Sequence, residues 1–422
     1  MNGILHKIET LRIMNMPVLK ESSIAFSILL LSSCTLSSTD TNIVDETDWK
    51  RQIDELALGE LKSSGLPSLQ IAIGNGKSIV FEGAYGLADV ENNVPATTHT
   101  KYRTASVSKW LTASAAMALA DKGMLDLDKP VQVYCPQFPQ KKWPVTTRQL
   151  ITHTSGVRHY ADYDAALASA KTEDERNRIE ARRLRDQLGT YTRYTDVIGP
   201  LANFKGDPLL FMPGSDWTYS SYGYRVLSCV IQGATAKDYS SVMSELVFSP
   251  LEMANTVEDD SFAIVPHRAS GYTLGEGKSL QRAELRDVSE NLAAGGHLST
   301  ATDLVKFALA FDSGQLLSAE VRTLMSRPLV NDDGPSAPTW RDVIPSREKY
   351  GYGMMMFPEG GAVRVGHTGR QAGSSSIVIL DPENHISIAV MTNAKGWNGS
   401  LELTKAIERI ASSYLRERSA ER

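Results

Sequence analysis

Residues 105–122 read ASVSKWLTASAAMALADK, and this alanine-rich run organises the rest of the chain. Its small and apolar residues, followed by Gly123, predict a helix that ends at a glycine C-cap. Ser106 and Lys109 stand three positions apart at the start of the run, so they share one helix face. A helix N-terminus favours negative charge and supplies a free backbone N–H, which suits a reacting serine oxygen. The run therefore predicts Ser106 as a nucleophile with Lys109 beside it.

Lys109 is the candidate that activates this serine. A serine hydroxyl is a poor nucleophile until another group takes its proton. A charged ammonium cannot act as a base, so Lys109 needs a depressed pKa or else acts electrostatically. The sequence leaves both alternatives open. An S-x-x-K pair also fits a solvent-facing helix surface. Other segments are therefore needed to decide whether Ser106 and Lys109 form a catalytic pair.

The second segment is residues 213–224, PGSDWTYSSYGY. Tyr219 beside a cationic lysine can lose its proton more easily and serve as general base or acid. Ser221 can offer its hydroxyl to a substrate amide or carboxylate. Taken alone, the segment also fits an aromatic-rich helix start that makes core contacts.

The third segment is residues 367–370, HTGR, on a late predicted strand. Gly369 lets a substrate approach the strand edge closely. The N–H of Arg370 can pair with that of Ser106 as an oxyanion hole. Taken alone, the segment also fits a strand-end histidine followed by a turn glycine.

The remaining pattern predicts an α/β protein. Strands near both ends build one antiparallel sheet flanked by helices, and an all-helical region at about 105–310 is inserted between them, with the active site at the seam. Asn75-Gly76 marks a hairpin, and the charge-dense run at 172–187 is a helix with a solvated face. The expected helices are 48–64, 172–187, 220–236, 302–316 and 400–414, and the expected strands are 68–74, 78–84, 362–367, 374–380 and 385–392. Residues 161–211 are interpreted as a lid-like insertion, inside a domain that covers residues 48–416.

Composition excludes several classes of protein. The 422 residues are 42% apolar and 22% charged, with a net charge of −5, which is typical of a globular protein and gives no reason to expect a nucleic-acid partner. None of the three cysteines lies in a CxxC pair, so a zinc or redox motif is not indicated. Cys135 and Cys229 are expected to be two buried thiols, although a bridge between them is possible from the sequence.

The N-terminus has the features of an export signal. Residues 22–33 read SSIAFSILLLSS, an uncharged apolar stretch followed directly by Cys34. The run resembles the bacterial lipobox, so residues 1–34 are interpreted as a lipoprotein-type signal peptide and Cys34 as the lipidated residue. Residues 35–47 then form a polar tether. The sequence thus predicts an exported bacterial membrane lipoprotein, on the periplasmic or cell-surface side, and Met14 and Met16 stay open as alternative starts.

In combination these segments carry a specific resemblance. S-x-x-K, Y-x-[NS] and [KH]-T-G in this order resemble the serine β-lactamase and penicillin-binding-protein superfamily, in the branch of class C β-lactamases and D-alanyl-D-alanine carboxypeptidases. The runs LITHTSG at 150–156 and AGGHLSTATD at 294–303 agree with it. The runs TSGVRHY at 154–160 and YSSYGY at 219–224 most resemble the mitochondrial serine β-lactamase-like proteins and their bacterial relatives, which are reported as peptidases. The resemblance covers roughly residues 50–415 and implies a β-lactamase/transpeptidase-like fold.

The resemblance also implies roles for the site residues. Ser106 would form the acyl-enzyme, while Lys109 and Tyr219 would share proton transfer. His367 would take the place of the lysine found in many β-lactamases. The positions that would line the substrate or the oxyanion hole are Ser221, His367, Thr368, Gly369 and Arg370. No metal or organic cofactor is implied, and the partner is a small peptide or ester substrate.

Two departures from the β-lactamase pattern narrow the expected function. Ser221 stands where class C enzymes mostly have asparagine, and His367 is only weakly charged at neutral pH. Both changes weaken the grip on a β-lactam, so poor antibiotic hydrolysis is expected. The leading hypothesis is a peptidase or amidase on small peptides, including D-amino-acid or cell-wall ones. The alternatives are an esterase or weak β-lactamase and, in another class, an inactive cell-surface binding or scaffold protein.

The lipidation prediction is tested by feeding cells a radiolabelled fatty acid. The wild-type chain should take up label, because a thiol at the mature N-terminus is acylated, and Cys34→Ala should not. Equal labelling of the two chains would contradict the anchor.

Overall fold

The computed structural model describes residues 47–329, 349–359 and 361–420. The chain divides into two units, Met1–Ile43 and Val44–Arg422, and every described residue belongs to the second. The signal peptide, Cys34 and the tether up to residue 46 lie outside the described residues, so they stay predictions. Within the described part, no helix is both long and apolar enough to cross a membrane.

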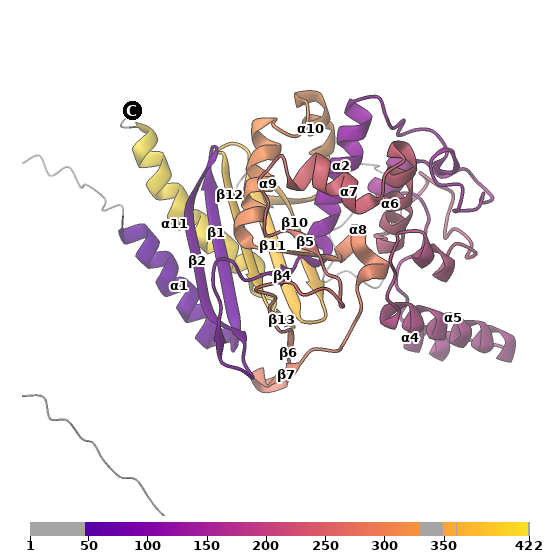
Figure 1. Cartoon of the computed structure of the whole chain (residues 1–422), viewed down its shortest axis with the longest axis horizontal. Helices are drawn as coiled ribbons and strands as arrows, with labels where there is room; N and C mark the ends of the chain where they lie inside the picture. Colours follow the sequence, from indigo (N-terminus) through magenta and orange to yellow (C-terminus); the bar gives the residue numbers. More distant parts are fainter. Residues whose placement is uncertain (1–46, 330–348, 360, 421–422) are drawn as a thin grey trace, which may run out of the picture. The chain divides into compact units, whose positions relative to one another are not determined.

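The described residues contain a seven-stranded antiparallel sheet that joins both ends of the domain (Figure 1). In sheet order its strands are β3 (Val94–Pro95), β2 (Ser78–Asp89), β1 (Ser68–Asn75), β12 (Ile386–Thr392), β11 (Ser374–Asp381), β10 (Ala362–Gln371) and β9 (Met355–Glu359). The pairing of β1 with β12, with Gln70 opposite Met391, brings the N-terminal hairpin against the C-terminal strands. The predicted hairpin is present, with Asn75 opposite Ser78 across the turn. The expected α/β architecture is confirmed.

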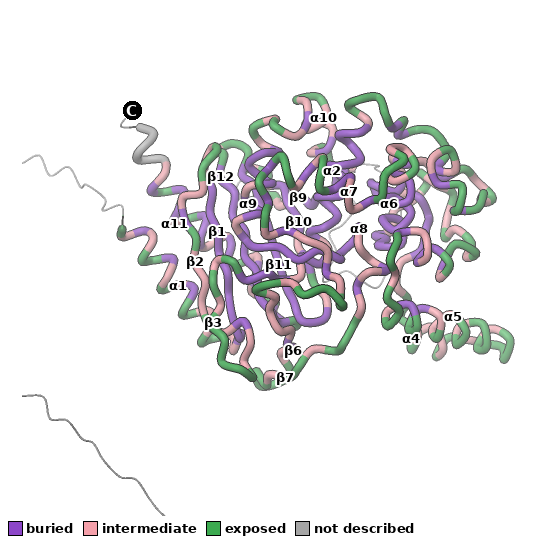
Figure 2. Tube along the Cα trace, in the orientation of Figure 1, coloured by how far each residue is buried: buried purple, intermediate pink, exposed green. Residues whose placement is uncertain are grey.

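Helices cover both faces of this sheet (Figure 1). Helices α1 (Asp48–Ser64) and α11 (Ser400–Ala420) lie on one face, where Trp49 stacks on Tyr414 at 5.3 Å between ring centroids. Helices α9 (Ala301–Ser313) and α2 (Ser108–Asp121) lie on the other, where Trp110 meets Phe307 edge-on at 4.9 Å. The central strands β11 and β12 are buried along their whole length because both faces are covered (Figure 2). Large aromatic contacts on both sides thus fix the sheet between two helical layers.

The inserted region is mainly helical, but it also contains short strands. Its helices include α3 (Thr147–Ile151), α4 (Tyr163–Ser169), α5 (Glu173–Tyr191), α6 (Ser221–Thr235), α7 (Tyr239–Met243) and α8 (Leu292–Gly295). Helix α10 (Ala319–Met325) comes after α9. Two three-stranded sheets accompany them in the described part: β4 (Tyr102–Arg103), β8 (His297–Ser299) and β5 (Val257–Glu258); and β13 (Ala394–Lys395), β6 (Tyr272–Leu274) and β7 (Leu280–Arg282). The expectation of an all-helical insertion is wrong in this respect, because β8 pairs with β4 and fastens the chain just before α2.

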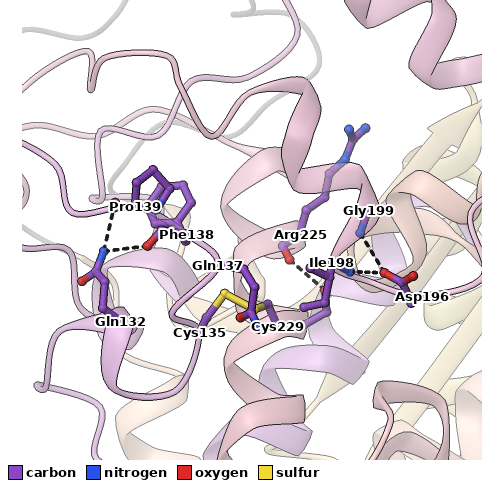
Figure 3. The surroundings of a disulfide bond; sticks show 11 residues. Gln132, Cys135, Gln137, Phe138, Pro139, Asp196, Ile198, Gly199, Arg225 and Cys229 are labelled. Carbon is purple, nitrogen blue, oxygen red and sulfur yellow. Dashed lines mark hydrogen bonds between the residues drawn. A yellow bond between two sulfur atoms is a disulfide. The ribbon is translucent and has the colours of Figure 1, made fainter.

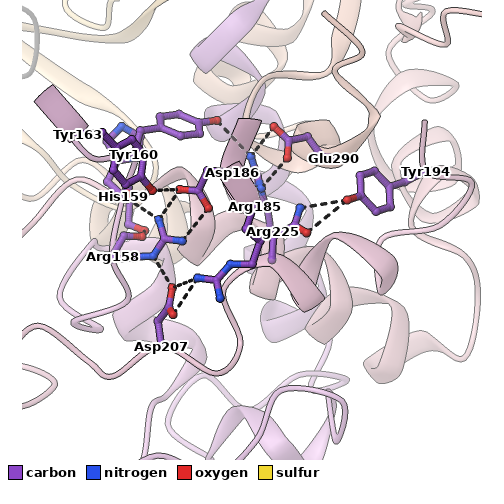
Figure 4. Close-up of polar contacts among 12 residues, drawn as sticks. Arg158, His159, Tyr160, Tyr163, Arg185, Asp186, Tyr194, Asp207, Arg225 and Glu290 are labelled. Atoms are coloured by element: carbon purple, nitrogen blue, oxygen red, sulfur yellow. Dashed lines mark hydrogen bonds and ion pairs between the residues drawn. The ribbon is translucent and has the colours of Figure 1, made fainter. Parts of the chain in front are cut away.

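The segment interpreted as a lid contains α4 and α5, whose surface is mostly exposed (Figure 2). It is tied to the domain through Arg158, whose guanidinium binds Asp186 of α5 at 2.9 Å and Asp207 at 2.6 Å (Figure 4). The Arg158 side chain is only 6% exposed, so this ion-pair network is largely shielded from solvent. The insertion is therefore anchored at a defined point, while its action as a lid stays a prediction.

Cys135 and Cys229 form a disulfide, with their Cα atoms 5.4 Å apart (Figure 3). The expectation of two separate thiols is therefore wrong. The two residues are 94 positions apart, and such a spacing carries no pairing signal. They meet because the backbone of α6 packs directly on the backbone at Tyr134, next to Cys135. A Cβ added at Gly233 of α6 would lie 1.7 Å from the carbonyl oxygen of Tyr134, so only glycine fits there.

The disulfide should stabilise the helical region. Closing a loop of this length restricts the unfolded chain and contributes up to about 5 kcal/mol. We expect the variant with both Cys135→Ala and Cys229→Ala to unfold at lower urea concentration than the wild type. A reducing agent should bring the wild type down to the variant and leave the variant unchanged. Equal unfolding midpoints of oxidised wild type and variant would contradict this role.

Candidate active site

Ser106 lies in a tight turn directly before α2. The turn Ala105–Val107 is a 3-10 segment, so the α-helix itself begins two residues after the serine. Ala105 has a φ of +46°, a conformation that is strained for a residue with a side chain. The Ser106 side chain is half-buried, and its Oγ lies 3.1 Å from Nζ of Lys109. The serine and lysine predicted to act together are therefore in direct contact.

Neighbouring strands hold this turn in place. The hydroxyls of Ser374 and Ser376 on β11 donate to the carbonyl oxygens of Arg103 and Thr104, both at 2.6 Å. A Cβ added at Gly369 would lie 2.3 Å from the same Thr104 oxygen, so only glycine permits this close approach of β10. The H-T-G segment is thus packed against the backbone that precedes the serine.

Lys109 is fully buried, and its surroundings disfavour a charge. Its Nζ donates to the carbonyl oxygen of Ala294 at 2.9 Å and lies 4.8 Å from the ring centre of Tyr219. Burial, with a further contribution from the positive charge of Arg225, holds the pKa of Lys109 well below its ordinary value. Of the two alternatives left open by the sequence, this environment favours the neutral amine, which has a lone pair to accept the Ser106 proton.

Tyr219 keeps its proton in this environment. Burial raises the pKa of Tyr219, and the hydrogen bond with Ser106 opposes that rise only in part. Burial lowers the pKa of Lys109 as well, so these surroundings oppose the lysine cation that was expected to help the phenol ionise; the role of Tyr219 as general base or acid stays a prediction. Tyr219 is therefore placed as a proton donor or relay next to both Ser106 and Lys109.

His367 is a buried, neutral imidazole. Its Nδ1 lies 2.6 Å from the carbonyl oxygen of Thr368, which can only accept, so Nδ1 carries the hydrogen. Its Nε2 then accepts from the hydroxyl of Tyr350 at 3.2 Å. Burial and the proximity of Lys109 lower the pKa of His367 to about 3. This side chain therefore supplies a hydrogen-bonding group where many β-lactamases have a charge.

The other predicted substrate positions differ in their exposure to solvent. Ser221 is the first residue of α6 and is almost fully buried, whereas Arg370 is exposed near the end of β10. Arg370 pairs with Ser375 in the strand ladder. Its role in an oxyanion hole with Ser106, like the substrate roles of Ser221 and Thr368, stays a prediction.

Several residues of the site were not identified from the sequence. The His153 ring packs on Tyr219 at 4.4 Å and on Tyr350 at 4.8 Å between centroids, and the His159 ring lies 5.4 Å from Tyr219. Both histidines fall in runs that resemble the family, and that position is the only signal that could have found them. Tyr350 follows no motif. Arg225, whose positive charge acts on Lys109, pairs with Glu290 at 3.0 Å (Figure 4).

Comparison with known proteins identifies the class. The Beta-lactamase family model matches residues 53–412, and the chain belongs to this family of serine β-lactamase-like hydrolases. The predicted family and fold are thereby confirmed.

Named relatives and solved structures agree with this family and fold. "Serine beta-lactamase-like protein LACTB, mitochondrial" is 30% identical over 404 residues in Mus musculus, covering 77% of this chain and 71% of that protein. The Homo sapiens protein of the same name is 31% identical over 387 residues, covering 76% and 69%. A D-amino acid amidase from Ochrobactrum anthropi matches in fold with a TM-score of 0.68 and 22% identity, covering 88% of this chain and 99% of that one. A penicillin-binding protein from Bacillus halodurans matches with a TM-score of 0.65 and 22% identity, covering 85% and 98%.

The buried histidines predict sensitivity to acid. Burial lowers the pKa of His297 to about 4, and it also lowers the pKa values of His153, His159 and His367. As pH falls below about 6.5, the unfolded chain therefore binds protons that the folded chain does not. The free energy of unfolding should then fall by up to about 1.4 kcal/mol per pH unit for each histidine. Urea unfolding between about pH 7 and pH 4 measures this slope. His297→Asn should reduce it, and an equal slope in both chains would contradict the assignment.

Proposed function

We propose that this protein is a serine acyl hydrolase that forms a covalent acyl-enzyme on Ser106 and acts on amide bonds of small peptides. The observation that carries the proposal is the 3.1 Å contact between Ser106 Oγ and Nζ of a fully buried Lys109. A neutral amine at this distance is a general base in hydrogen-bond reach of the nucleophile. The family membership of the chain supports the same class of chemistry.

The proposed proton transfers use the groups gathered around Ser106. Lys109 takes the hydroxyl proton as Ser106 Oγ attacks the substrate carbonyl, and the backbone N–H groups of Ser106 and Arg370 stabilise the oxyanion. The Tyr219 phenol gives its proton to the leaving amine and recovers one from Lys109. A water molecule then attacks the acyl-enzyme. Tyr219 and Lys109 now act in reverse: together they take a proton from the water and return one to Ser106 Oγ as it leaves. The products are an amine and a carboxylic acid, and the enzyme regains its starting protonation.

The substrate class rests on the lack of charge at His367. A neutral imidazole grips a carboxylate less firmly than a lysine, which favours peptide amides over β-lactams. Two solved structures with this fold are titled D-amino acid amidase and D-stereospecific amidohydrolase, which supports amides and includes D-amino-acid substrates. Ester hydrolysis is the second candidate, because the protonated Tyr219 is less needed for an alkoxide or phenoxide leaving group.

We also propose that the protein works outside the cytoplasm. The disulfide between Cys135 and Cys229 supports an oxidising compartment. It agrees with the export signal and lipid anchor expected at Cys34, which would make the membrane a partner.

The proposal is tested with the full chain and a panel of D-amino-acid peptides, L-peptides, p-nitrophenyl esters and nitrocefin. Ser106→Ala and Lys109→Met should each lower turnover by about a thousandfold or more, because nucleophile and base act as one unit. The wild-type rate should rise with pH as Lys109 loses its proton, with a midpoint below that of an ordinary lysine.

Four outcomes would contradict the proposal or a part of it. Turnover that survives Ser106→Ala would rule out Ser106 as the nucleophile. A pH midpoint at the ordinary lysine value would rule out neutral Lys109 as the base. Failure of a fluorophosphonate probe to label the folded wild type would favour the inactive scaffold. Rapid nitrocefin turnover would overturn the preference for peptides over β-lactams.

A further inference from the structure

Two histidines bind the first backbone N–H groups of α6. Nδ1 of His153 accepts the N–H of Ser220, and Nδ1 of His159 accepts the N–H of Ser221, both at 3.1 Å. Helix N-termini leave such N–H groups without intrahelical partners, and side-chain oxygens usually bind them. Here Ser220 Oγ accepts the N–H of Gly223 at 2.9 Å, while the imidazoles accept the N–H groups of Ser220 and Ser221. The helix start that immediately follows Tyr219 is therefore fixed at three backbone N–H groups, those of Ser220, Ser221 and Gly223.

Both imidazoles also contact the Tyr219 ring. The His153 ring lies tilted against it at 4.4 Å, and the His159 ring meets it edge-on at 5.4 Å. The carbonyl oxygen of His153 accepts the N–H of Thr218 at 3.0 Å, so the backbone on the other side of Tyr219 is held as well. The phenol is thus located by its ring contacts and by the chain on both sides.

A neutral acceptor suits this position. Nδ1 can accept an N–H only when it is unprotonated, so both rings are neutral as long as these hydrogen bonds exist. Aspartate, a common helix cap, would bind the same N–H groups but would bring a negative charge close to Lys109. That charge would raise the pKa of Lys109 and favour the ammonium, which cannot accept the Ser106 proton. Imidazole holds the helix start without adding this charge.

The His159 side of this arrangement depends on the insertion. The neighbouring Arg158 accepts a 2.7 Å hydrogen bond from Ser220 Oγ through its carbonyl oxygen, and its guanidinium binds Asp186 and Asp207 (Figure 4). The segment that carries His159 is therefore braced by α5 on one side and bound to α6 on the other.

We propose that His153 and His159 are positioning residues that clamp the start of α6 and so place the Tyr219 phenol for proton transfer at Ser106. This inference rests on the proposed function, because it assigns the clamp to the proton-transfer step. It predicts that loss of the Nδ1 acceptor lowers kcat more than it changes KM.

The test uses a matched pair at His159, where the backbone has no positive φ that would strain a substituted side chain. His159→Asn keeps an acceptor, since the amide oxygen reaches the place of Nδ1, whereas His159→Leu has similar size and no acceptor. His153→Asn is the companion variant, because asparagine tolerates the φ of +62° at that position and leucine does not. We expect His159→Leu to lower kcat at least about tenfold with KM within about twofold, and both asparagine variants to stay within about threefold of the wild type.

The controls separate this inference from the proposed function. Wild type and Ser106→Ala are first compared with a fluorophosphonate probe, and an unlabelled wild type would overturn the function and the clamp together. Given a labelled wild type, a His159→Leu chain with wild-type kcat would overturn the clamp alone. An asparagine variant as slow as the leucine variant would also overturn it. If His159→Leu does not fold, the two asparagine variants decide: kcat near wild type supports the clamp, and a tenfold loss overturns it.

Discussion

The burial of Lys109 is the constraint on which the rest of this structure depends. An amine that is removed from water gives up its proton more easily, and only the neutral form can accept a proton from Ser106. The fold therefore has to surround Lys109 without placing an unpaired carboxylate beside it. It does so with a carbonyl oxygen from Ala294 and with aromatic rings.

The charges near Lys109 are arranged to respect that constraint. Arg225 lies close enough to oppose protonation of the lysine, and its own cost of burial is offset by the ion pair with Glu290. Among the titratable rings near Lys109, His153 and His159 each accept a backbone N–H on Nδ1, which requires a neutral ring, and burial lowers the pKa of His367. The backbone is strained at Ala105, next to the nucleophile.

Local patterns were enough to predict much of the fold. Asn75-Gly76 identified the hairpin of β1 and β2, and the charged run at 172–187 identified α5, because both signals are carried by neighbouring residues. Spacing alone also placed Ser106 beside Lys109. Sequence could not show that Lys109 is buried or that Cys135 meets Cys229, since both depend on packing between distant segments. Tyr350 was missed for the same reason: its contact with His367 forms only in the folded domain.

The backbone around Ser106 has a consequence for how the activity appears during synthesis. The turn before the serine is held by Gly369, Ser374 and Ser376, which are added to the chain about 270 residues after it. Pairing of β1 with β12 likewise waits for the C-terminal strands. Contacts of such long range form late in folding. A growing or truncated chain would therefore carry the serine and the lysine but no finished site, so its chemistry stays silent until the last strands have docked.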